Sequence, residues 1–330
     1  MKTDIDGRRL RFAPPNPLQR PKKAPKRIEL KEADYLLFEA IERHGPLPSH
    51  YLYAFTKHLR KDETHLKNRL TEFYNGDEGG PYLVRPPRQF QTFEARYQHV
   101  VYDLAPRAIA ALEARRARLS YPKPRSIDFV HDLMAACATA SIELAAKEKG
   151  VRYIDRNEIL AHPSCPRATK DGAHPLSITI AGKLITPDDL FGLEYPREGD
   201  KPLRRFFWFE ADRSTERIRS SVEHQSSFGR KLRQVYGVIR GKLFHERWGI
   251  PNLHALTLTT THGRKENLVD FTKEEVDPQL APRFGFQVEP IFGARYADGE
   301  QHWRVPRTVL SYLFDEPWSG VSGSKDIGQL

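Results

Sequence analysis

The sequence predicts a mixed α and β protein in which a helix-rich domain precedes an α/β domain. Three observations support this fold class. The chain has 330 residues, enough for two domains of ordinary size. Helical patterns dominate up to about residue 120, whereas strands and helices alternate beyond it. The stretch "SYPKPRS" (120–126) separates the two regions, and its prolines are typical of a domain boundary.

Four regions are expected along the chain. A basic, proline-rich arm covers residues 1–30 and is predicted to be disordered. The first domain covers 31–120 and the second covers 126–272. Residues 273–330 form a C-terminal extension without a readable pattern. Its end, "PWSGVSGSKDIGQL", is expected to be flexible, with docking of Trp318 on the domain as the alternative.

The charge balance favours a polyanionic partner. Lys and Arg number 53 against 43 Asp and Glu, a formal net charge of +10. Nucleic acid fits this surplus, with an anionic membrane surface as the alternative. No apolar run approaches the ~20 residues needed to span a bilayer, and we expect no membrane partner. Two cysteines exclude a disulfide framework and predict a reducing cytoplasm.

Two enzyme classes are disfavoured by the motifs. The sequence contains no P-loop, which argues against an ATP-driven motor. It also contains no GxSxG motif or paired Cys and His arrangement for acyl transfer.

The first domain has the element order of a winged helix-turn-helix. Periodicity and caps predict helices over 31–45, 47–55 and 62–74, strands in 81–91 and 95–104, and a closing helix over 105–119. In a winged helix the third helix enters the major groove and the hairpin touches the DNA backbone. The same fold also serves as a protein-interaction module, and that alternative stays open.

DNA contacts are expected from two places in this domain. The third helix carries the candidate groove contacts Lys67, Asn68 and Arg69. The hairpin carries the candidate phosphate contacts Arg85 and Arg88.

The second domain begins with a long helix and continues as an α/β alternation. The patterns predict a helix over 127–150, a strand over 151–155, strands within 176–195 with a turn at Gly182, a strand over 204–212, one or two helices within 216–249, a strand over 252–261 and a helix from 264.

Two of these strands end in carboxylates. "ITPDD" carries Asp188, and "FFWFEAD" carries Glu210 and Asp212, which share one face because strand side chains alternate. About twenty residues separate the two stretches, so a hairpin would bring the acids together. Close carboxylates repel unless a cation lies between them, and their hard oxygens suit Mg²⁺ or Mn²⁺. Such an ion activates water and neutralises charge on a phosphodiester.

A plainer interpretation of these acids stays open. Asp188 and Asp189 are also typical turn residues after a proline. Glu210 and Asp212 are close enough in sequence to several arginines to form ordinary surface salt bridges.

The acidic pattern resembles the core of PD-(D/E)xK nucleases, a restriction-endonuclease-like α/β fold. The resemblance lies in Pro187-Asp188 and Glu210-x-Asp212 behind a helix that contains Glu143. With the winged helix in front, the order of "FVHDLMAACATASIELA", "PDDLFGL", "FFWFEADRSTE", "KLRQVY" and "LTLTTTHGRKENL" is similar to that of the replication-relaxation family. That family is associated with plasmid and mobile-element replication and with DNA relaxation. The resemblance covers residues 31–272.

The resemblance implies roles for particular residues. Asp188 and Glu210 match the metal-binding acids, with Mg²⁺ or Mn²⁺ as the cofactor. Glu143 matches an acid that some of these nucleases contribute from the first helix. Tyr236, together with Lys231 or Gln234, matches the DNA-facing side of the helix after the third strand.

The sequence departs from the nuclease pattern at Asp212. The pattern has a lysine there, which orients the attacking water and offsets charge on the phosphate. We expect Asp212 to add a third carboxylate to the metal site, and Lys231 to supply the missing cation through its long stem. Arg213 and Lys183 are alternative cations.

The expected function is therefore DNA binding in plasmid or mobile-element replication or DNA relaxation, with metal-dependent endonuclease or nicking activity. The alternative is a catalytically inactive nuclease-fold protein that serves as a replication accessory or transcriptional regulator. A third option is an interaction module recruited to replication or conjugation proteins. Double-stranded DNA is the expected partner, and a homodimer remains open.

Overall fold

The computed structural model describes residues 27–90, 98–115, 121, 126, 128–197, 199, 201–214, 216–218, 227–295, 301–321 and 323–328. Most of the basic arm and most of the "SYPKPRS" boundary lie outside these residues. The described residues form a mixed α and β structure, as the sequence predicts.

The N-terminal half, residues 27–115, packs helices against a small sheet. Its helices are α1 (Glu32–His44), α2 (Ser49–Thr56), η1 (Lys57–Leu59), α3 (Glu63–Asn75), η2 (Pro87–Phe90) and α4 (Pro106–Arg115). Its strands are β1 (Leu47–Pro48), β2 (Leu83–Val84) and β3 (Val101–Leu104). They form an antiparallel sheet with β3 in the middle.

The predicted start of α3 is confirmed. The Asp62 side chain accepts a hydrogen bond from the amide of His65 at 2.7 Å, so it is the N-cap. Leu66, Leu70 and Phe73 recur at helical spacing and are buried in the core. The opposite face of α3 is exposed to solvent.

The C-terminal half, residues 126–328, is built on a large sheet. Its helices are α5 (Phe129–Glu148), α6 (Arg156–Ala161), α7 (Arg167–Lys170), α8 (Phe228–Arg240), α9 (Leu243–Trp248), α10 (His262–Glu275), η3 (Ala281–Arg283), η4 (Pro290–Phe292) and α11 (Tyr312–Asp315). Its strands are β4 (Arg152–Ile154), β5 (Ile178–Ile180), β6 (Lys183–Ile185), β7 (Asp189–Tyr195), β8 (Leu203–Asp212), β9 (His254–Thr259), β10 (Phe284–Val288), β11 (Ala294–Arg295), β12 (Gln301–His302), β13 (Trp318–Gly320) and β14 (Gly323–Lys325).

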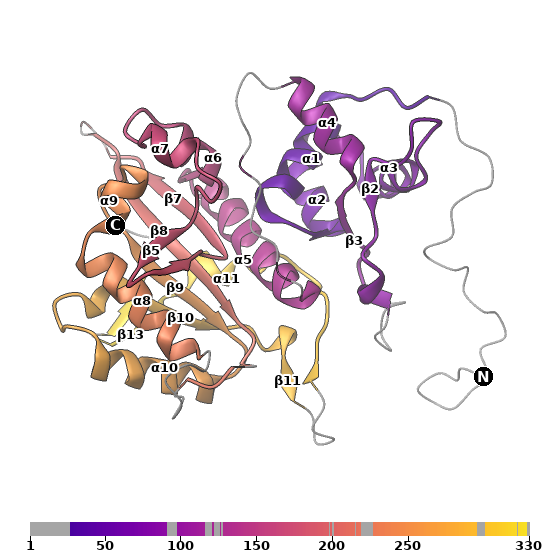
Figure 1. Cartoon of the computed structure of the whole chain (residues 1–330). Helices are drawn as coiled ribbons and strands as arrows, with labels where there is room; N and C mark the ends of the chain where they lie inside the picture. Colours follow the sequence, from indigo (N-terminus) through magenta and orange to yellow (C-terminus); the bar gives the residue numbers. More distant parts are fainter. Residues whose placement is uncertain are drawn as a thin grey trace, which may run out of the picture.

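The large sheet has the strand order β14-β13-β10-β9-β8-β7-β4. Strands β8, β9 and β10 run parallel, whereas the other neighbours are antiparallel. Helix α5 covers one face, between the sheet and the N-terminal half, and α8 and α10 lie on the other face (Figure 1). The pairs β5-β6 and β11-β12 are separate hairpins.

Alternation along β8 decides which helices its side chains meet. Phe207 and Phe209 point into the core formed with α5 and the N-terminal half. Trp208 points into the core beneath α8, α9 and α10. Because residues two apart share a face, Glu210 and Asp212 lie on the side of Trp208, toward α8 and α10.

Helix α5 joins the two halves. It packs against α1 and α2 as well as against the sheet, and a single apolar cluster contains residues from all of these elements. Contrary to the expectation that no apolar run approaches a membrane-spanning length, it is the one helix among the described residues long and apolar enough to cross a membrane, but 78% of its most apolar window is buried inside the protein. Such burial is typical of a core helix.

A buried arginine adds polar contacts between the halves. The Arg156 guanidinium donates hydrogen bonds to the carbonyls of Glu42, at 2.7 Å, and Arg43, at the end of α1. It also donates to the carbonyl of Tyr121 at 3.0 Å. Arg156 therefore satisfies carbonyl groups that a helix C-terminus leaves unpaired.

The C-terminal residues form part of the sheet, which the sequence did not predict. Strand β10 pairs with β9, and the β13-β14 hairpin extends the sheet beyond β10. Trp318 is fully buried, and its indole N–H donates to the carbonyl of Leu313 at 2.8 Å. The expected flexibility of "PWSGVSGSKDIGQL" is wrong for residues 317–321 and 323–328, because strand pairing and burial hold them in place, whereas the alternative, docking of Trp318, is confirmed.

Replacing Trp318 with alanine should destabilise the whole protein. Loss of a fully buried Trp side chain costs about 3–5 kcal/mol, through lost burial and the cavity left behind. Urea unfolding measures this difference in the free energy of unfolding. Ile109→Ala is the control, because Ile109 is 41% exposed and should change stability little. Equal stability of the two variants would contradict docking of the C-terminal strands.

Candidate functional site

The pairing of β7 with β8 brings two acids together. Asp189 pairs with Phe209 in the antiparallel register, so Asp188, one residue earlier, comes level with Glu210. The Asp188 amide donates to the carbonyl of Phe209 at 3.1 Å, and its carboxylate accepts from the amide of Ala211 at 2.8 Å. The hairpin expected from the sequence is therefore present, and it holds Asp188 at the end of β8.

Glu210 is almost completely buried. Its side chain is 3% exposed, and its Oε1 accepts a hydrogen bond from the indole N–H of Trp208 at 2.5 Å. A buried carboxylate is costly unless it is paired with a positive charge. The pairing partner comes from α8.

Lys231 supplies that positive charge. Ser227 caps α8, and Lys231 follows in the first turn, on the side that faces the sheet. Its ammonium forms an ion pair with Glu210 Oε2 and lies 3.9 Å from Asp188 Oδ1. Lys231 thus places one cation between the two acids, from a helix instead of from the strand.

His131 is a further residue at the site, and the sequence analysis gave it no role. It lies in the first turn of α5, and its Nε2 is 3.1 Å from Asp188 Oδ2. Burial lowers the pKa of His131, but the neighbouring carboxylates of Asp132 and Asp188 overcome this and raise the pKa to about 10. The imidazole is therefore a second cation beside Asp188 at neutral pH.

The pKa shifts of the acidic pair have opposite directions. Burial opposes ionisation of Asp188, yet the charges of Lys231 and His131 hold its pKa well below the usual range. Burial, reinforced by the charge of Asp188, raises the pKa of Glu210 against the opposing effect of Lys231. Two carboxylates in one buried place behave in this way, because the second to ionise meets the charge of the first.

The structure gives Asp212 a different environment from Glu210. Its carboxylate accepts two hydrogen bonds from the Arg264 guanidinium, at 2.7 and 3.2 Å, from the first turn of α10. The Ser214 amide and the Thr259 hydroxyl also donate to it, at 3.0 and 3.3 Å. Both oxygens thus hold protein donors, and metal binding by Asp212 stays a prediction that these contacts do not support.

The structure does not bring Glu143 to the acidic pair. Glu143 follows His131 by twelve residues, which is about 18 Å along the helix. Its carboxylate pairs with Arg43 at 2.8 Å and His44 at 2.6 Å, both at the end of α1. Glu143 therefore forms contacts between the two halves, because the part of α5 that carries it packs against α1.

Arg213, one of the alternative cations, pairs elsewhere. Its guanidinium forms an ion pair with Asp128, the N-cap of α5, and donates to the carbonyl of Phe292 at 3.4 Å. Lys183 is exposed in β6. Of the three cations that the sequence offered, Lys231 is the one with an ion pair to the acids.

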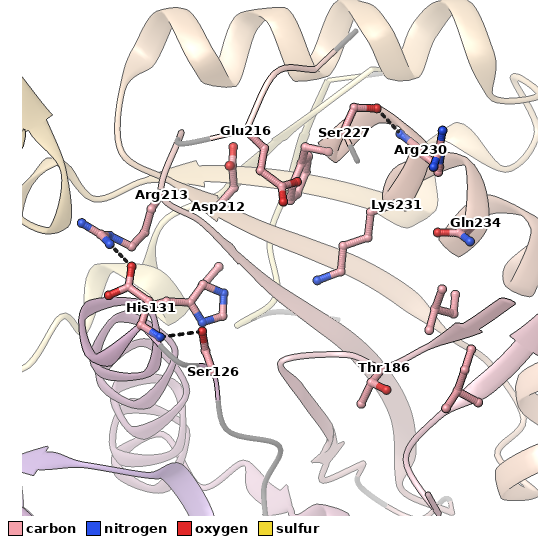
Figure 2. A pocket seen from close by; sticks show the side chains of 15 residues that line it. Ser126, His131, Thr186, Asp212, Arg213, Glu216, Ser227, Arg230, Lys231 and Gln234 are labelled. Atoms are coloured by element: carbon pink, nitrogen blue, oxygen red, sulfur yellow. Dashed lines mark hydrogen bonds and ion pairs between the residues drawn. The ribbon is translucent and has the colours of Figure 1, made fainter. Parts of the chain in front are cut away.

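A cleft of about 560 Å³ lies next to the acidic pair and is lined by Lys231 and His131, which contact the pair, but not by Asp188 or Glu210 themselves. Figure 2 shows Lys231, Gln234 and Arg230 from α8 on one side, His131 and Ser126 on another, and Asp212 and Arg213 at the end of β8. Among the residues that the structure describes, no three His, Cys, Asp or Glu side chains are grouped as a metal-binding set. A metal bound here would need oxygen ligands from water or substrate.

The predicted groove contacts of α3 differ in their surroundings. Lys67 and Asn68 are exposed, and Lys67 pairs with Glu63 one turn earlier at 2.9 Å. Arg69 turns inward instead, where its guanidinium pairs with the buried Asp34 at 2.7 Å and with Glu72 at 2.9 Å. Arg69 as a DNA contact stays a prediction, although its present contacts lie within the N-terminal half.

The predicted hairpin contacts also differ. Arg85 lies over the ring of Tyr74 and donates to the Tyr102 hydroxyl at 3.0 Å. Arg88 is 48% exposed and pairs with Asp128 at 3.2 Å. Part of the predicted hairpin, residues 91–97, lies outside the described residues.

Tyr236 is half-buried and packs against the apolar cluster beneath α8. It follows Lys231 by five residues, which turns it about 140° around the helix. Lys231 and Gln234 line the cleft, whereas Tyr236 does not. Its predicted role in DNA binding has no contact in the structure that supports it.

Comparisons with protein-family models, curated proteins and solved structures find no match to this chain. The geometry of the cleft and the N-terminal half therefore carries the functional argument.

The Glu143 contacts predict a pH-dependent loss of stability. Burial raises the pKa of Glu143, but Arg43 and His44 overcome this and lower it to about 2. The unfolded chain has a pKa of about 4.3, so ionised Glu143 stabilises the fold above that pH. This contribution is lost as pH falls from about 4.5 toward 2. Glu143→Gln should therefore be less stable than wild type at pH 7 and approach wild type near pH 3.

Urea unfolding of both proteins at pH 7, 5 and 3 checks this expectation. An equal difference in the free energy of unfolding at all three pH values would show that the Glu143 charge does not matter.

Proposed function

We propose that the protein binds double-stranded DNA and cleaves or nicks it with the help of a divalent metal. The observation that carries this proposal is the Lys231 ammonium, which lies against Glu210 and 3.9 Å from Asp188. The nuclease pattern needs a lysine charge beside its two acids, and Asp212 occupies the usual position of that lysine. Lys231 supplies the same charge from α8, which favours an active site over an inactive one.

The order of elements supports a PD-(D/E)xK-like domain. Helix α5 precedes the antiparallel strands β4, β7 and β8, and α8 then leads to β9, parallel to β8. Asp188 directly precedes the second of these strands, and Glu210 lies near the end of the third. This is the arrangement that the sequence resemblance implies for a restriction-endonuclease-like core.

The acidic pair suits Mg²⁺ or Mn²⁺ in its ligand chemistry. Asp188 and Glu210 are level with each other and have hard carboxylate oxygens, but Trp208 and Lys231 already contact the two oxygens of Glu210, so an ion would have to displace Lys231 from Glu210. The described residues add no third acid of a metal-binding group, but Mg²⁺ commonly binds one or two carboxylates and keeps several waters. When bound, such an ion supplies charge neutralisation and an activated water for phosphodiester hydrolysis.

The protein's own side chains then have distinct tasks. Asp188 and Glu210 would hold the ion, and the Ala211 amide orients the Asp188 carboxylate. Lys231 would offset negative charge on the phosphate, because its ammonium already lies at the cleft. Arg264 and Asp212 join α10 to the end of β8 and so hold that strand end in place.

The N-terminal half supports DNA binding. Helices α1, α2 and α3, followed by β2 and β3, with β1 joining the sheet, have the order of a winged helix-turn-helix. Lys67 and Asn68 are exposed on α3, the element that enters the major groove in that fold. We propose that this half selects duplex DNA in the cytoplasm during plasmid or mobile-element replication or DNA relaxation.

A second candidate function is DNA binding without cleavage, as a replication accessory or regulator. The observation that favours it is that Lys231 and His131 already neutralise the acids. A protein that satisfies its buried carboxylates internally can keep this cluster for stability alone.

Nicking of supercoiled plasmid tests the first candidate. Wild type with Mg²⁺ or Mn²⁺ should convert supercoiled DNA to nicked circles, and Asp188→Ala and Glu210→Ala should abolish this. Lys231→Ala should slow nicking by at least about a hundredfold, the usual cost of one lost electrostatic contact to the transition state. Gel densitometry over time gives the rates.

Arg233→Ala is the matched control for Lys231→Ala. Arg233 lies on the same helix, is exposed and pairs with Glu275 at 2.7 Å, away from the acids. Its loss should leave nicking unchanged. Absence of nicking by wild type, with normal duplex binding by all variants, would favour the non-catalytic candidate.

Lys67→Ala should weaken duplex binding and lower the slope of log affinity against log salt by about one, because one phosphate contact is lost. Fluorescence anisotropy with a labelled duplex at several salt concentrations measures both quantities. Lys149→Ala is the control, since Lys149 is also an exposed lysine with an acidic partner, Asp315. Identical slopes for the two variants would remove α3 from the DNA interface.

A further inference from the structure

One carboxylate is shared by the two halves of the protein at the edge of the cleft. Asp128 Oδ1 lies 3.2 Å from the guanidinium of Arg88, which belongs to the N-terminal half. Asp128 Oδ2 pairs with Arg213, next to Asp212 at the end of β8. Asp128 and Arg213 both line the cleft.

The two ion pairs of Asp128 differ in exposure. Arg88 is 48% exposed and Asp128 is 33% exposed, so their pair is largely in contact with water. Exposed pairs of this kind contribute little and exchange readily. Arg213 is 7% exposed and also donates to the carbonyl of Phe292, so it is held more firmly.

We propose that the N-terminal half and the cleft form one continuous surface for the phosphate backbone of a single duplex, with Asp128 as the counter-ion at their junction. Without DNA, Asp128 holds Arg88 beside Arg213. With DNA, a backbone phosphate replaces the carboxylate as the partner of Arg88.

The charges of the cleft wall and the core shared by the two halves both favour this arrangement. The cleft is lined by Arg213, Arg230 and Lys231, so cationic side chains continue from the junction toward the acidic pair, although the acids Asp212 and Glu216 line it as well. Guanidinium groups bind phosphate as readily as carboxylate, since both present oxygens to the same donors. The apolar core around α5 joins the halves, so the junction keeps its place when Arg88 changes partner.

The proposal rests on the DNA binding in the proposed function but not on cleavage. In this arrangement the negative charge of Asp128 weakens DNA binding, although Asp128 lies among cationic side chains. Removing its charge should strengthen binding, which a merely structural Asp128 would not do.

The test is duplex binding without metal, in EDTA, by fluorescence anisotropy with full-length protein. Asp128→Asn keeps an N-cap, because Asn and Asp cap helices about equally. It should bind duplex about three- to tenfold more tightly than wild type, the effect of one charge removed beside phosphate. Arg88→Ala should weaken binding more in the Asp128→Asn background than in wild type, because Arg88 no longer has to leave a carboxylate.

Asp155→Asn is the matched control. Asp155 also caps a helix, α6, and pairs with an arginine, Arg43, at 3.4 Å, but it does not line the cleft. This variant makes the same change in net charge and should bind like wild type. Circular dichroism and thermal unfolding check that all variants are folded.

Two results separate the proposals. If Asp128→Asn and Asp155→Asn bind alike, or if Arg88→Ala costs the same in both backgrounds, the shared surface is wrong while DNA binding stands. If wild type does not bind duplex at all, both the shared surface and the proposed function are wrong.

Discussion

Two carboxylates on adjacent strands cannot both stay ionised in one buried place unless positive charge lies between them. The register of β7 and β8 imposes this problem, because it sets Asp188 level with Glu210. Lys231 from α8 and His131 from α5 provide positive charge, which keeps Asp188 ionised, while burial and the charge of Asp188 still raise the pKa of Glu210. The acidic pair therefore joins helices from both faces of the sheet to the same strand ends, and residues from the start of both helices line the cleft.

The same constraint explains the other inward acids. Asp212, two residues beyond Glu210, meets α10 and is paired by Arg264. Glu143 lies farther along α5 and is paired by Arg43 and His44. Each buried acid is thus joined to the element that packs beside it. Because α8 supplies the lysine, Asp212 can occupy the strand position, where it links β8 to α10.

Helix α5 connects recognition to the cleft. Its apolar body belongs to the same core as the N-terminal half and the sheet. Its first turn carries His131 and its cap is Asp128, so the helix start lies at the cleft while the rest contacts α1 and α2. A helix buried on several sides gives little freedom for relative movement of the parts that it joins. The shared core therefore fixes the distance between α3 and the acidic pair.

Local sequence patterns predicted the features that depend on near neighbours in the chain. Helical periodicity, the Asp62 cap and strand alternation predicted α1, α3, α5, β7 and β8, and the short hairpin predicted the meeting of Asp188 with Glu210. The partner of each charged side chain depends on the folded arrangement of distant segments. Arg264 is 52 residues from Asp212 and His131 is 57 residues from Asp188, and Arg69 and Glu143 also pair across the fold with residues that no local pattern marks. Strands β13 and β14 were missed for the same reason, since they are stabilised by pairing with a distant sheet and by burial of Trp318 rather than by their own propensity.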